Sequence, residues 1–149
     1  MKIKDIMKTN IITVFPDTPY LKVVKILYDN NISGMPVVDE NQNLIGMISE
    51  KDLFKALYPN YIEFIRNPEK YINLEEQEKN ILEIKNNPIS LYMSKNIITV
   101  SPQTSILAAG GIMLNKHIHR LPVVENNKLV GIVTRKDIYK SILKHYLKF

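Results

Sequence analysis

Two short motifs in this chain place a hydroxyl and a carboxylate three residues apart. They are Ser49 with Asp52 and Thr134 with Asp137, and each follows a glycine and two apolar residues. This is the spacing of a capping box, in which the two side chains satisfy free backbone N–H groups at a helix N-terminus. Such N-termini attract anions, and a carboxylate there can accept hydrogen bonds from the paired hydroxyls of a ribose. The motifs therefore predict two helix N-termini with the chemistry to bind a polar, sugar-containing or anionic ligand.

The rest of the chain is organised as an internal duplication around these motifs. Residues 10–18 match residues 96–104 at a constant offset of 86, and Pro36 falls on Pro122 at the same offset. One deletion in the turn near Asn126 then brings the two hydroxyl–carboxylate motifs into register. So many matches in register indicate a structural unit that is present twice. The predicted divisions are a first copy at 1–57, a helical insert at 58–88, and a second copy with a C-terminal helical tail at 89–149.

The residue patterns of each copy predict the order β-α-β-β-α. A β-branched run predicts the first strand, and Thr18 followed by Pro19 is typical of a helix N-cap and first helical position. Apolar residues three and four apart predict the helix that follows, and two apolar strands joined by an Asn-rich turn predict a hairpin. In the first copy the expected elements are a strand at Asn10–Val14, a helix from Tyr20 to Leu27, strands at Met35–Val38 and Leu44–Ile48, and a helix from Ser49 through Leu57.

The second copy and the insert add two features. Gly110 and Gly111 fall within the helix predicted for residues 106–115, where each glycine costs about 1 kcal/mol relative to alanine. Because such a cost is tolerated where two backbones approach closely, we place this helix at an interface. In the insert, Asn73 and Glu76 have capping-box spacing before a charged, helix-prone run from Leu74 to Lys85, and the insert is predicted to form one or two helical segments without evident chemistry.

Composition and charge limit the possible classes of function. The 149 residues include no Cys, which excludes disulfides, thiolate metal sites and cysteine nucleophiles. No apolar run approaches the roughly 18 residues of a membrane span, and no signal peptide is evident, so we expect a cytoplasmic protein that does not enter a membrane. Residues 89–149 carry nine basic and two acidic residues, which favours an anionic partner. No nucleophile motif or glycine-rich phosphate loop is present, so we do not expect an enzyme.

Both copies resemble cystathionine-β-synthase (CBS) domains, and the pair resembles a Bateman module. The resemblance covers residues 3–57 and 89–142 and rests on Pro-Val-Val with an acidic residue, a turn, and the glycine that leads into the hydroxyl–carboxylate motif. It implies an α/β (α+β) fold in which two tandem β-α-β-β-α units pack as a pseudo-two-fold pair. It also implies a regulatory module that binds AMP, ADP, ATP or S-adenosylmethionine without a required cofactor, and acts through a protein effector or a homodimer.

In this family each ligand site is composite, and the resemblance implies the same here. One copy contacts the ribose through its hydroxyl–carboxylate motif, while the first strand and the segment before the proline of the other copy surround the adenine. Site A then comprises Gly46, Met47, Ser49, Asp52, Ile98, Thr99, His119, Arg120, Leu121, Pro122 and Lys136. Site B comprises Ile12, Thr13, Ser33, Gly34, Met35, Pro36, Gly131, Ile132, Thr134 and Asp137.

The two sites are not expected to bind the same ligand. His119 and Arg120 resemble the His-Arg pair of the γ subunit of AMP-activated protein kinase, which contacts nucleotide phosphates. Arginine offers planar charged donors suited to phosphate, and Lys136 could add a further cation. The first copy has Ser33 and Gly34 at the matching positions. We therefore expect phosphorylated nucleotides in site A, and a less charged adenosine compound or no ligand in site B.

Other interpretations stay open at this point. The family pattern could be kept as a ligand-free structural or interaction module, and Arg120 could serve only as a surface ion-pair partner. The basic second half could bind nucleic acid, although no helix-turn-helix or aromatic-basic strand pattern is present. His117 and His119 could suggest a metal pair, but no third ligand lies in that segment, so we expect no metal site.

Overall fold

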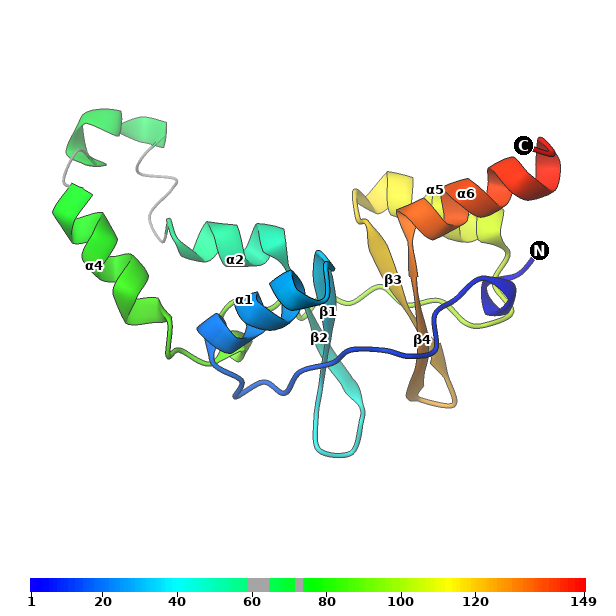
Figure 1. The fold of residues 1–149 in the computed structure, drawn as a ribbon, viewed down its shortest axis with the longest axis horizontal. Coiled ribbons are helices and arrows are strands. Elements are labelled where there is room, and N and C mark those ends of the chain that lie inside the picture. The colour runs from blue at the N-terminus through cyan, green and yellow to red at the C-terminus, as the bar shows by residue number, and fades with distance from the viewer. Residues whose placement is uncertain (59–64, 72–73) are drawn as a thin grey trace. The chain divides into compact units, whose positions relative to one another are not determined.

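The computed structural model describes residues 1–58, 65–71 and 74–149 of the chain (Figure 1). The contacts of the chain group it into two compact units. Unit 1 contains Met1–Ile12, Glu40–Leu44 and Asn96–Phe149. Unit 2 contains Thr13–Asp39 and Ile45–Lys95. The N-terminal segment of each sequence copy therefore belongs to the compact unit that is built mainly from the other copy.

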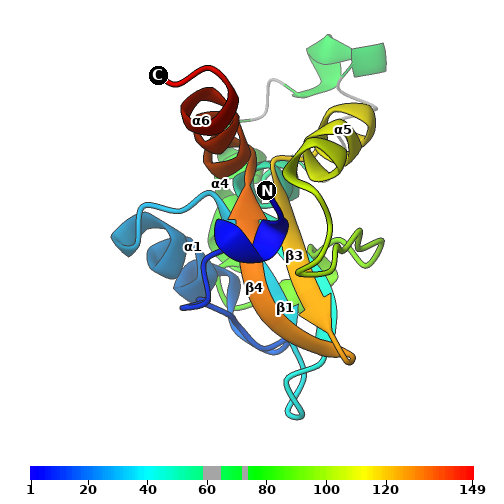
Figure 2. The same ribbon diagram turned by 90° about the vertical axis from the view of Figure 1, so that its right-hand side faces the viewer.

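Unit 1 is a two-stranded antiparallel hairpin with two helices packed at one end (Figure 2). The strands are β3 (Arg120–Glu125) and β4 (Lys128–Thr134), and the helices are α5 (Ile106–Lys116) and α6 (Arg135–Tyr146). The short 3-10 turn η1 (Ile3–Asp5) supplies the N-terminal part of the unit. The predicted helix and hairpin of the second copy are thus confirmed.

The hairpin turn of unit 1 consists of Asn126 and Asn127. Both residues have positive φ angles, 49° and 62°, as the central residues of a type I′ turn require. Asparagine tolerates this left-handed region better than other non-glycine residues. The Asn-rich turn expected from the sequence therefore forms because its residues fit the twist of a two-residue hairpin.

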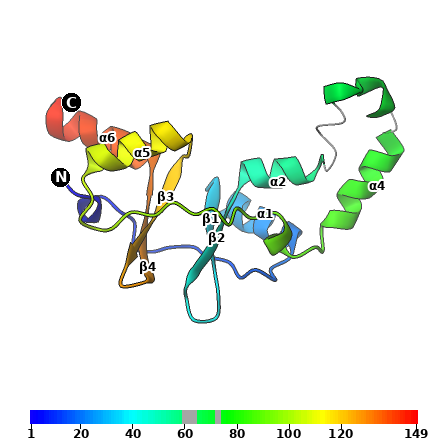
Figure 3. The ribbon, with the colours of Figure 1, turned by 180° about the vertical axis from the view of Figure 1, so that it is seen from behind.

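Unit 2 repeats the helix–hairpin–helix order (Figures 1 and 3). Its elements are α1 (Tyr20–Asp29), β1 (Gly34–Val38), β2 (Leu44–Ser49) apart from its first residue, α2 (Glu50–Ala56) and the 3-10 turn η3 (Ile89–Leu91). The insert contributes the 3-10 turn η2 (Pro68–Tyr71) and the predicted helix α4 (Leu74–Ile84). Asn73, which the sequence suggested as the cap of α4, lies outside the described residues. Within those residues, no helix combines the length and apolar character needed to cross a membrane.

The strand predicted at Asn10–Val14 forms only a single β-bridge, in which Val14 pairs in parallel with Val37. The N–H of Val14 donates to the carbonyl of Pro36 at 3.2 Å. The ladder cannot lengthen, because Pro36 has no N–H to return and Pro16 follows closely in the paired segment. The prediction of a regular strand here is therefore wrong, although the pairing itself exists. The second copy forms the equivalent bridge between Val100 and Val123.

Thr18 does not cap α1, contrary to the prediction. Its hydroxyl accepts a hydrogen bond from the N–H of Phe15 at 3.2 Å, and the helix begins at Tyr20 with Pro19 as its N-cap. The N–H of Tyr20 instead donates to the carbonyl of Asn87 at 2.8 Å. A backbone carbonyl near the end of the insert thus satisfies an N–H that a capping side chain would otherwise have taken.

Each unit has its own hydrophobic core. The core of unit 1 includes a residue from the N-terminal segment, Ile3, whose side chain is fully buried. Its other buried members are Val100, Ile106, Ala109, Met113, Leu121, Val123, Val133 and Ile138. The buried apolar residues of unit 2 are Val14, Tyr20, Val23, Leu27, Met35, Val37, Val38, Ile48, Leu53 and Ile89.

The two glycines of α5 have different surroundings. A Cβ atom added to Gly110 would lie 3.4 Å from Cγ2 of Ile138, so this glycine faces the close approach of α5 to α6. A Cβ atom on Gly111 would have no atom within 4 Å. The prediction of a close approach thus holds for Gly110 within its own unit, while an interface with another molecule stays a prediction.

Candidate functional site

Both hydroxyl–carboxylate motifs form complete capping boxes, as predicted. In unit 1, Oδ2 of Asp137 accepts hydrogen bonds from the N–H of Thr134 at 3.0 Å and from its hydroxyl at 2.6 Å. In unit 2, Oδ2 of Asp52 accepts from the N–H and the hydroxyl of Ser49, both at 2.9 Å. Each cap holds a half-buried carboxylate at the N-terminus of a helix, where the helix dipole favours negative charge.

A backbone hydrogen bond in unit 1 ties this cap to the residues that precede the hairpin. The N–H of Arg135 donates to the carbonyl of His119 at 2.8 Å, and Arg120 is the cross-strand partner of Thr134. Cross-strand partners in an antiparallel pair lie on the same face of the sheet. Within unit 1, the segment that carries exposed His119 and half-buried Arg120 therefore lies next to the Thr134–Asp137 cap, whereas the sequence had grouped these two residues with Asp52 in site A.

Unit 2 makes the equivalent connection. The N–H of Glu50 donates to the carbonyl of Ser33 at 2.9 Å, so Ser33 and Gly34 lie beside the cap formed by Ser49 and Asp52. The two units thus share one backbone scaffold at this place, while the side chains before the hairpin differ in charge. His119 and Arg120 therefore occupy the same backbone positions in unit 1 as Ser33 and Gly34 do in unit 2, and the difference in charge that the sequence indicated lies at these positions.

Gly131 allows a remote segment of the chain to run against β4 in unit 1. Lys8 and Ile132 exchange two backbone hydrogen bonds, of 2.9 Å from the Lys8 N–H and 3.0 Å from the Ile132 N–H. A Cβ atom on Gly131 would lie 2.7 Å from Sδ of Met7 and 3.2 Å from the carbonyl oxygen of Lys8. The glycine is needed because the two backbones approach this closely.

Gly46 has the same role in unit 2. Met47 and Ser94 exchange backbone hydrogen bonds of 2.9 and 2.8 Å, and a Cβ atom on Gly46 would lie 2.5 Å from Sδ of Met93 and 3.2 Å from the carbonyl oxygen of Ser94. The glycine of each motif, which the family resemblance placed in the ligand sites, therefore has a structural function. The backbone N–H and C=O of Met47 are engaged by the same contact.

Replacing Gly131 with alanine is expected to lower the free energy of unfolding by about 1–3 kcal/mol, the range for overpacking a tight contact. The side chain of Met7 can move, but the carbonyl of Lys8 can move only by lengthening the two hydrogen bonds to Ile132. Chemical denaturation followed by circular dichroism measures the loss. Gly111→Ala is the matched control, because its space is open and a helix interior favours alanine by about 0.5–1 kcal/mol. A Gly131→Ala protein as stable as the wild type would contradict this interpretation.

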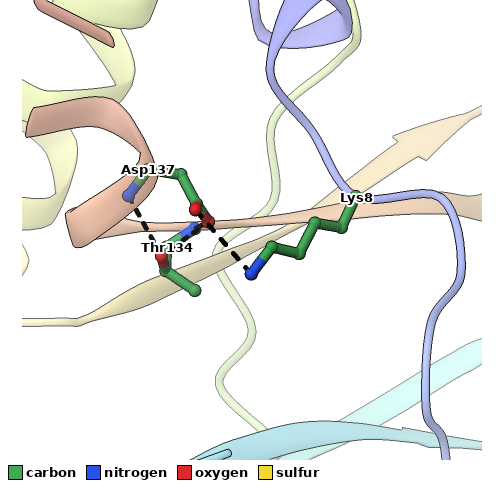
Figure 4. A network of polar contacts seen from close by, with 3 residues as sticks. All are labelled: Lys8, Thr134 and Asp137. Carbon is green, nitrogen blue, oxygen red and sulfur yellow. Dashed lines mark hydrogen bonds and ion pairs between the residues drawn. The ribbon is translucent and has the colours of Figure 1, made fainter. Parts of the chain in front are cut away.

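The structure adds one charged residue that sequence reasoning did not include, Lys8. Its ammonium group lies 3.7 Å from Oδ1 of Asp137 (Figure 4), whereas the hydrogen bonds from Thr134 go to Oδ2. Lys8 is more than a hundred residues from Asp137 in sequence, so no local spacing could indicate the pair. At the repeat offset of 86, however, Lys8 corresponds to Ser94. The sequence therefore does indicate that the two copies differ in charge at this position.

The remaining predicted site residues are distributed over both units. Several of them are buried residues of the hairpins, namely Gly34, Met35, Pro36, Leu121 and Pro122. Half-buried or exposed positions are Ile12, Thr13, Ile98, Thr99 and Lys136. No three His, Cys, Asp or Glu residues in the described ranges are grouped as a metal ion would require.

The tandem helix–hairpin–helix units, each with a capped carboxylate after its hairpin, define a duplicated domain architecture. The chain matches the family model of the CBS domain over residues 3–59 and 89–144. The chain therefore belongs to the CBS domain family and contains a tandem pair of these domains. The uncharacterized protein MJ1426 of Methanocaldococcus jannaschii is 32% identical to it, over 96% of this chain and 92% of that protein.

Two solved structures of CBS pairs resemble this chain along almost its whole length. One is the CBS domain pair of protein MJ0100 in complex with 5′-methylthioadenosine and S-adenosyl-L-methionine, which is 26% identical, with a TM-score of 0.73 over 95% of each chain. The other is CBSX2 in complex with AMP, which is 25% identical, with a TM-score of 0.74 over 99% of this chain and 98% of that chain. Both confirm the CBS-pair fold.

Proposed function

We propose that this chain is a regulatory module that binds adenosine-containing ligands of the AMP, ADP, ATP or S-adenosylmethionine type, and that it acts by binding rather than by catalysis. The observation that carries the proposal is the pair of capped carboxylates, Asp52 and Asp137, at equivalent helix N-termini of a CBS pair. Two related CBS pairs in complex with ligands of this class support it.

Each group of the proposed sites has a chemical role. The carboxylates of Asp52 and Asp137 accept hydrogen bonds from the two ribose hydroxyls, while backbone groups near Ile12 and Ile98 contact the edge of the adenine. His119 and Arg120, with Lys136 nearby on α6, contact phosphate, because arginine combines a permanent charge with donors that match phosphate oxygens. The module requires no cofactor in this proposal.

Regulation would pass through a homodimer or a protein effector. Leu107, Gly111 and Leu114 are spaced as neighbours on one face of α5, and the side chains of Leu107 and Leu114 are 55% and 68% exposed. An exposed apolar face with a glycine at its centre supports close packing against another molecule. A ligand would shift such an assembly only as far as it binds one state more tightly than the other.

Calorimetric titration with AMP, ATP, S-adenosylmethionine and 5′-methylthioadenosine tests the proposal. We expect at least one of the four to bind with a defined stoichiometry. If none binds at high protein concentration, the sensor function fails and a ligand-free interaction module is the better description. The excess of basic residues at 89–149 then favours nucleic acid as the partner, and binding that weakens steeply with salt would support that second function.

Arg120→Ala is expected to lower the affinity for ATP roughly tenfold, since a hydrogen bond to a charged group contributes about 1.5–3 kcal/mol. The affinity for 5′-methylthioadenosine is expected to stay within about twofold of the wild-type value. The two ligands share the adenine and the ribose diol, and 5′-methylthioadenosine carries an uncharged methylthio group where ATP carries its triphosphate, so the difference between their titrations reports on the phosphate contact. Lys116→Ala, an exposed position at the end of α5, controls for the loss of one positive charge. Equal weakening of both ligands would contradict the assigned role of Arg120.

A further inference from the structure

Lys8 and Asp137 form an ion pair within unit 1, which Figure 4 shows with the cap of Thr134 beside it. The distance from Nζ of Lys8 to Oδ1 of Asp137 is 3.7 Å, and the two side chains are 64% and 22% exposed. We call Lys8, Thr134 and Asp137 the Asp137 half-site. Its carboxylate is the group to which the proposed function assigns the ribose hydroxyls.

The backbone of Lys8 is held by hydrogen bonds, while its side chain is largely exposed. The two hydrogen bonds with Ile132 hold the main chain of Lys8 beside β4, and the close approach at Gly131 keeps it there. The side chain then extends over four methylene groups to Asp137 with most of its surface in water. A cation on such a tether can leave one anionic partner for another a few ångströms away.

The other copy provides an internal comparison. At the repeat offset of 86, Lys8 corresponds to Ser94, which makes the same pair of backbone hydrogen bonds, here with Met47. A serine carries no charge and is too short to form such an ion pair with Asp52. The backbone scaffold is therefore repeated in both units, whereas the cation is present in only one of them.

The positions of the hydrogen bonds determine what a ligand must displace. Oδ2 of Asp137 is engaged by the backbone N–H and the hydroxyl of Thr134, so a pair of ribose hydroxyls also needs Oδ1, the oxygen nearest Lys8. Binding of the hydroxyls thus competes with the ammonium group. An uncharged ligand leaves Lys8 without its partner, whereas a ligand with an anionic group supplies a new one.

We propose that Lys8 makes the Asp137 half-site selective for adenosine ligands that carry an anionic group, such as phosphate, on the 5′ side. This inference rests on the proposed function and refines it, because the sequence alone led us to expect a less charged compound or no ligand at the site of Asp137. The cation comes from the N-terminal segment, and the ligand exchanges one anionic partner of Lys8 for another.

Titration of AMP and adenosine against an Asp52→Ala protein, with and without Lys8→Ser, tests this inference, since the two ligands differ only by the phosphate. The Asp52→Ala background limits adenosine binding to the Asp137 half-site. Lys8→Ser is expected to lower the affinity for AMP roughly tenfold, because a charge-assisted contact is lost. The affinity for adenosine is expected to stay unchanged or to rise about two- to fivefold, because a competing exposed ion pair is lost. An AMP-to-adenosine affinity ratio that does not change would overturn the inference.

Three further variants separate the possible outcomes. Lys8→Arg keeps the charge and is expected to keep the ratio, while Lys4→Ser removes a charge from an exposed position in the same segment and is expected to leave both affinities unchanged. Conversely, Ser94→Lys in an Asp137→Ala background is expected to raise the ratio at the other site.

If the wild type binds AMP but the Asp52→Ala protein binds neither ligand, this inference fails while the proposed function stands. If the wild type binds neither, both fail.

Discussion

Removing both capped carboxylates, by Asp52→Ala together with Asp137→Ala, is expected to weaken AMP and 5′-methylthioadenosine alike by about 100-fold or more. A ribose donates two hydrogen bonds to one carboxylate, and each bond to a charged group contributes about 1.5–3 kcal/mol. Each tenfold change in affinity corresponds to about 1.4 kcal/mol, so the loss of two bonds gives at least two factors of ten. Calorimetric titration measures the effect, and each single variant is expected to halve the stoichiometry if both sites are occupied.

The control for this experiment must account for the second role of the same residues. Asp52 and Asp137 are members of capping boxes, and the loss of a cap costs about 0.5–2 kcal/mol of stability. Ser105→Ala removes a cap from α5, where the Ser105 hydroxyl accepts a hydrogen bond from the N–H of Ala108 at 3.0 Å, without touching either carboxylate. Should Ser105→Ala weaken AMP as strongly as the aspartate variants, helix stability rather than ribose recognition would explain the loss.

The capping boxes could be predicted from the sequence because they depend only on local spacing. Ser49 and Asp52 are three residues apart, and the box that they form needs no partner from elsewhere in the chain. The helices and hairpins followed from apolar periodicity and turn residues for the same reason. The duplication then strengthened each local prediction, since the same pattern appeared twice and both copies fold alike.

Features that depend on remote backbone partners could not be predicted in this way. The N–H of Tyr20 is satisfied by the carbonyl of Asn87 rather than by Thr18, and nothing near Thr18 indicates this. The strand at Asn10–Val14 stops after one bridge because its partner contains Pro36, which only the tertiary pairing reveals. Lys8 reaches Asp137 because the N-terminal segment joins unit 1, an arrangement that a division at the repeat boundaries does not suggest.

Ile3→Ala is expected to lower the free energy of unfolding by about 2–5 kcal/mol, the range for truncating a fully buried aliphatic side chain. Residues near a chain terminus are usually tolerant of change. Ile3, however, is 0% exposed within the core of unit 1. Its N–H donates to the carbonyl of Thr104 at 2.8 Å, and the N–H of Lys4 donates to that of Pro102 at 2.9 Å. The N-terminal segment is therefore part of the fold of the second copy.

Ile89→Ala is the matched variant and is expected to have a similar cost in unit 2. Ile89 corresponds to Ile3 at the offset of 86 and is likewise 0% exposed. Its N–H donates to the carbonyl of Thr18 at 2.9 Å, and that of Ser90 donates to the carbonyl of Pro16 at 3.0 Å. These acceptors are the repeat equivalents of Thr104 and Pro102, so each copy completes the unit of the other by the same contacts.

Hydrogen exchange resolved along the chain separates the two effects. Ile3→Ala is expected to accelerate exchange chiefly in α5 and α6, and Ile89→Ala chiefly in α1 and α2, because local stability follows the core that each residue fills. Leu91→Ala, with a side chain 65% exposed, is expected to change neither. Faster exchange in α1 and α2 after Ile3→Ala would contradict the interleaved units. A fragment of residues 89–149 would lack Ile3 and leave the core of unit 1 open, so one copy alone is not expected to fold stably.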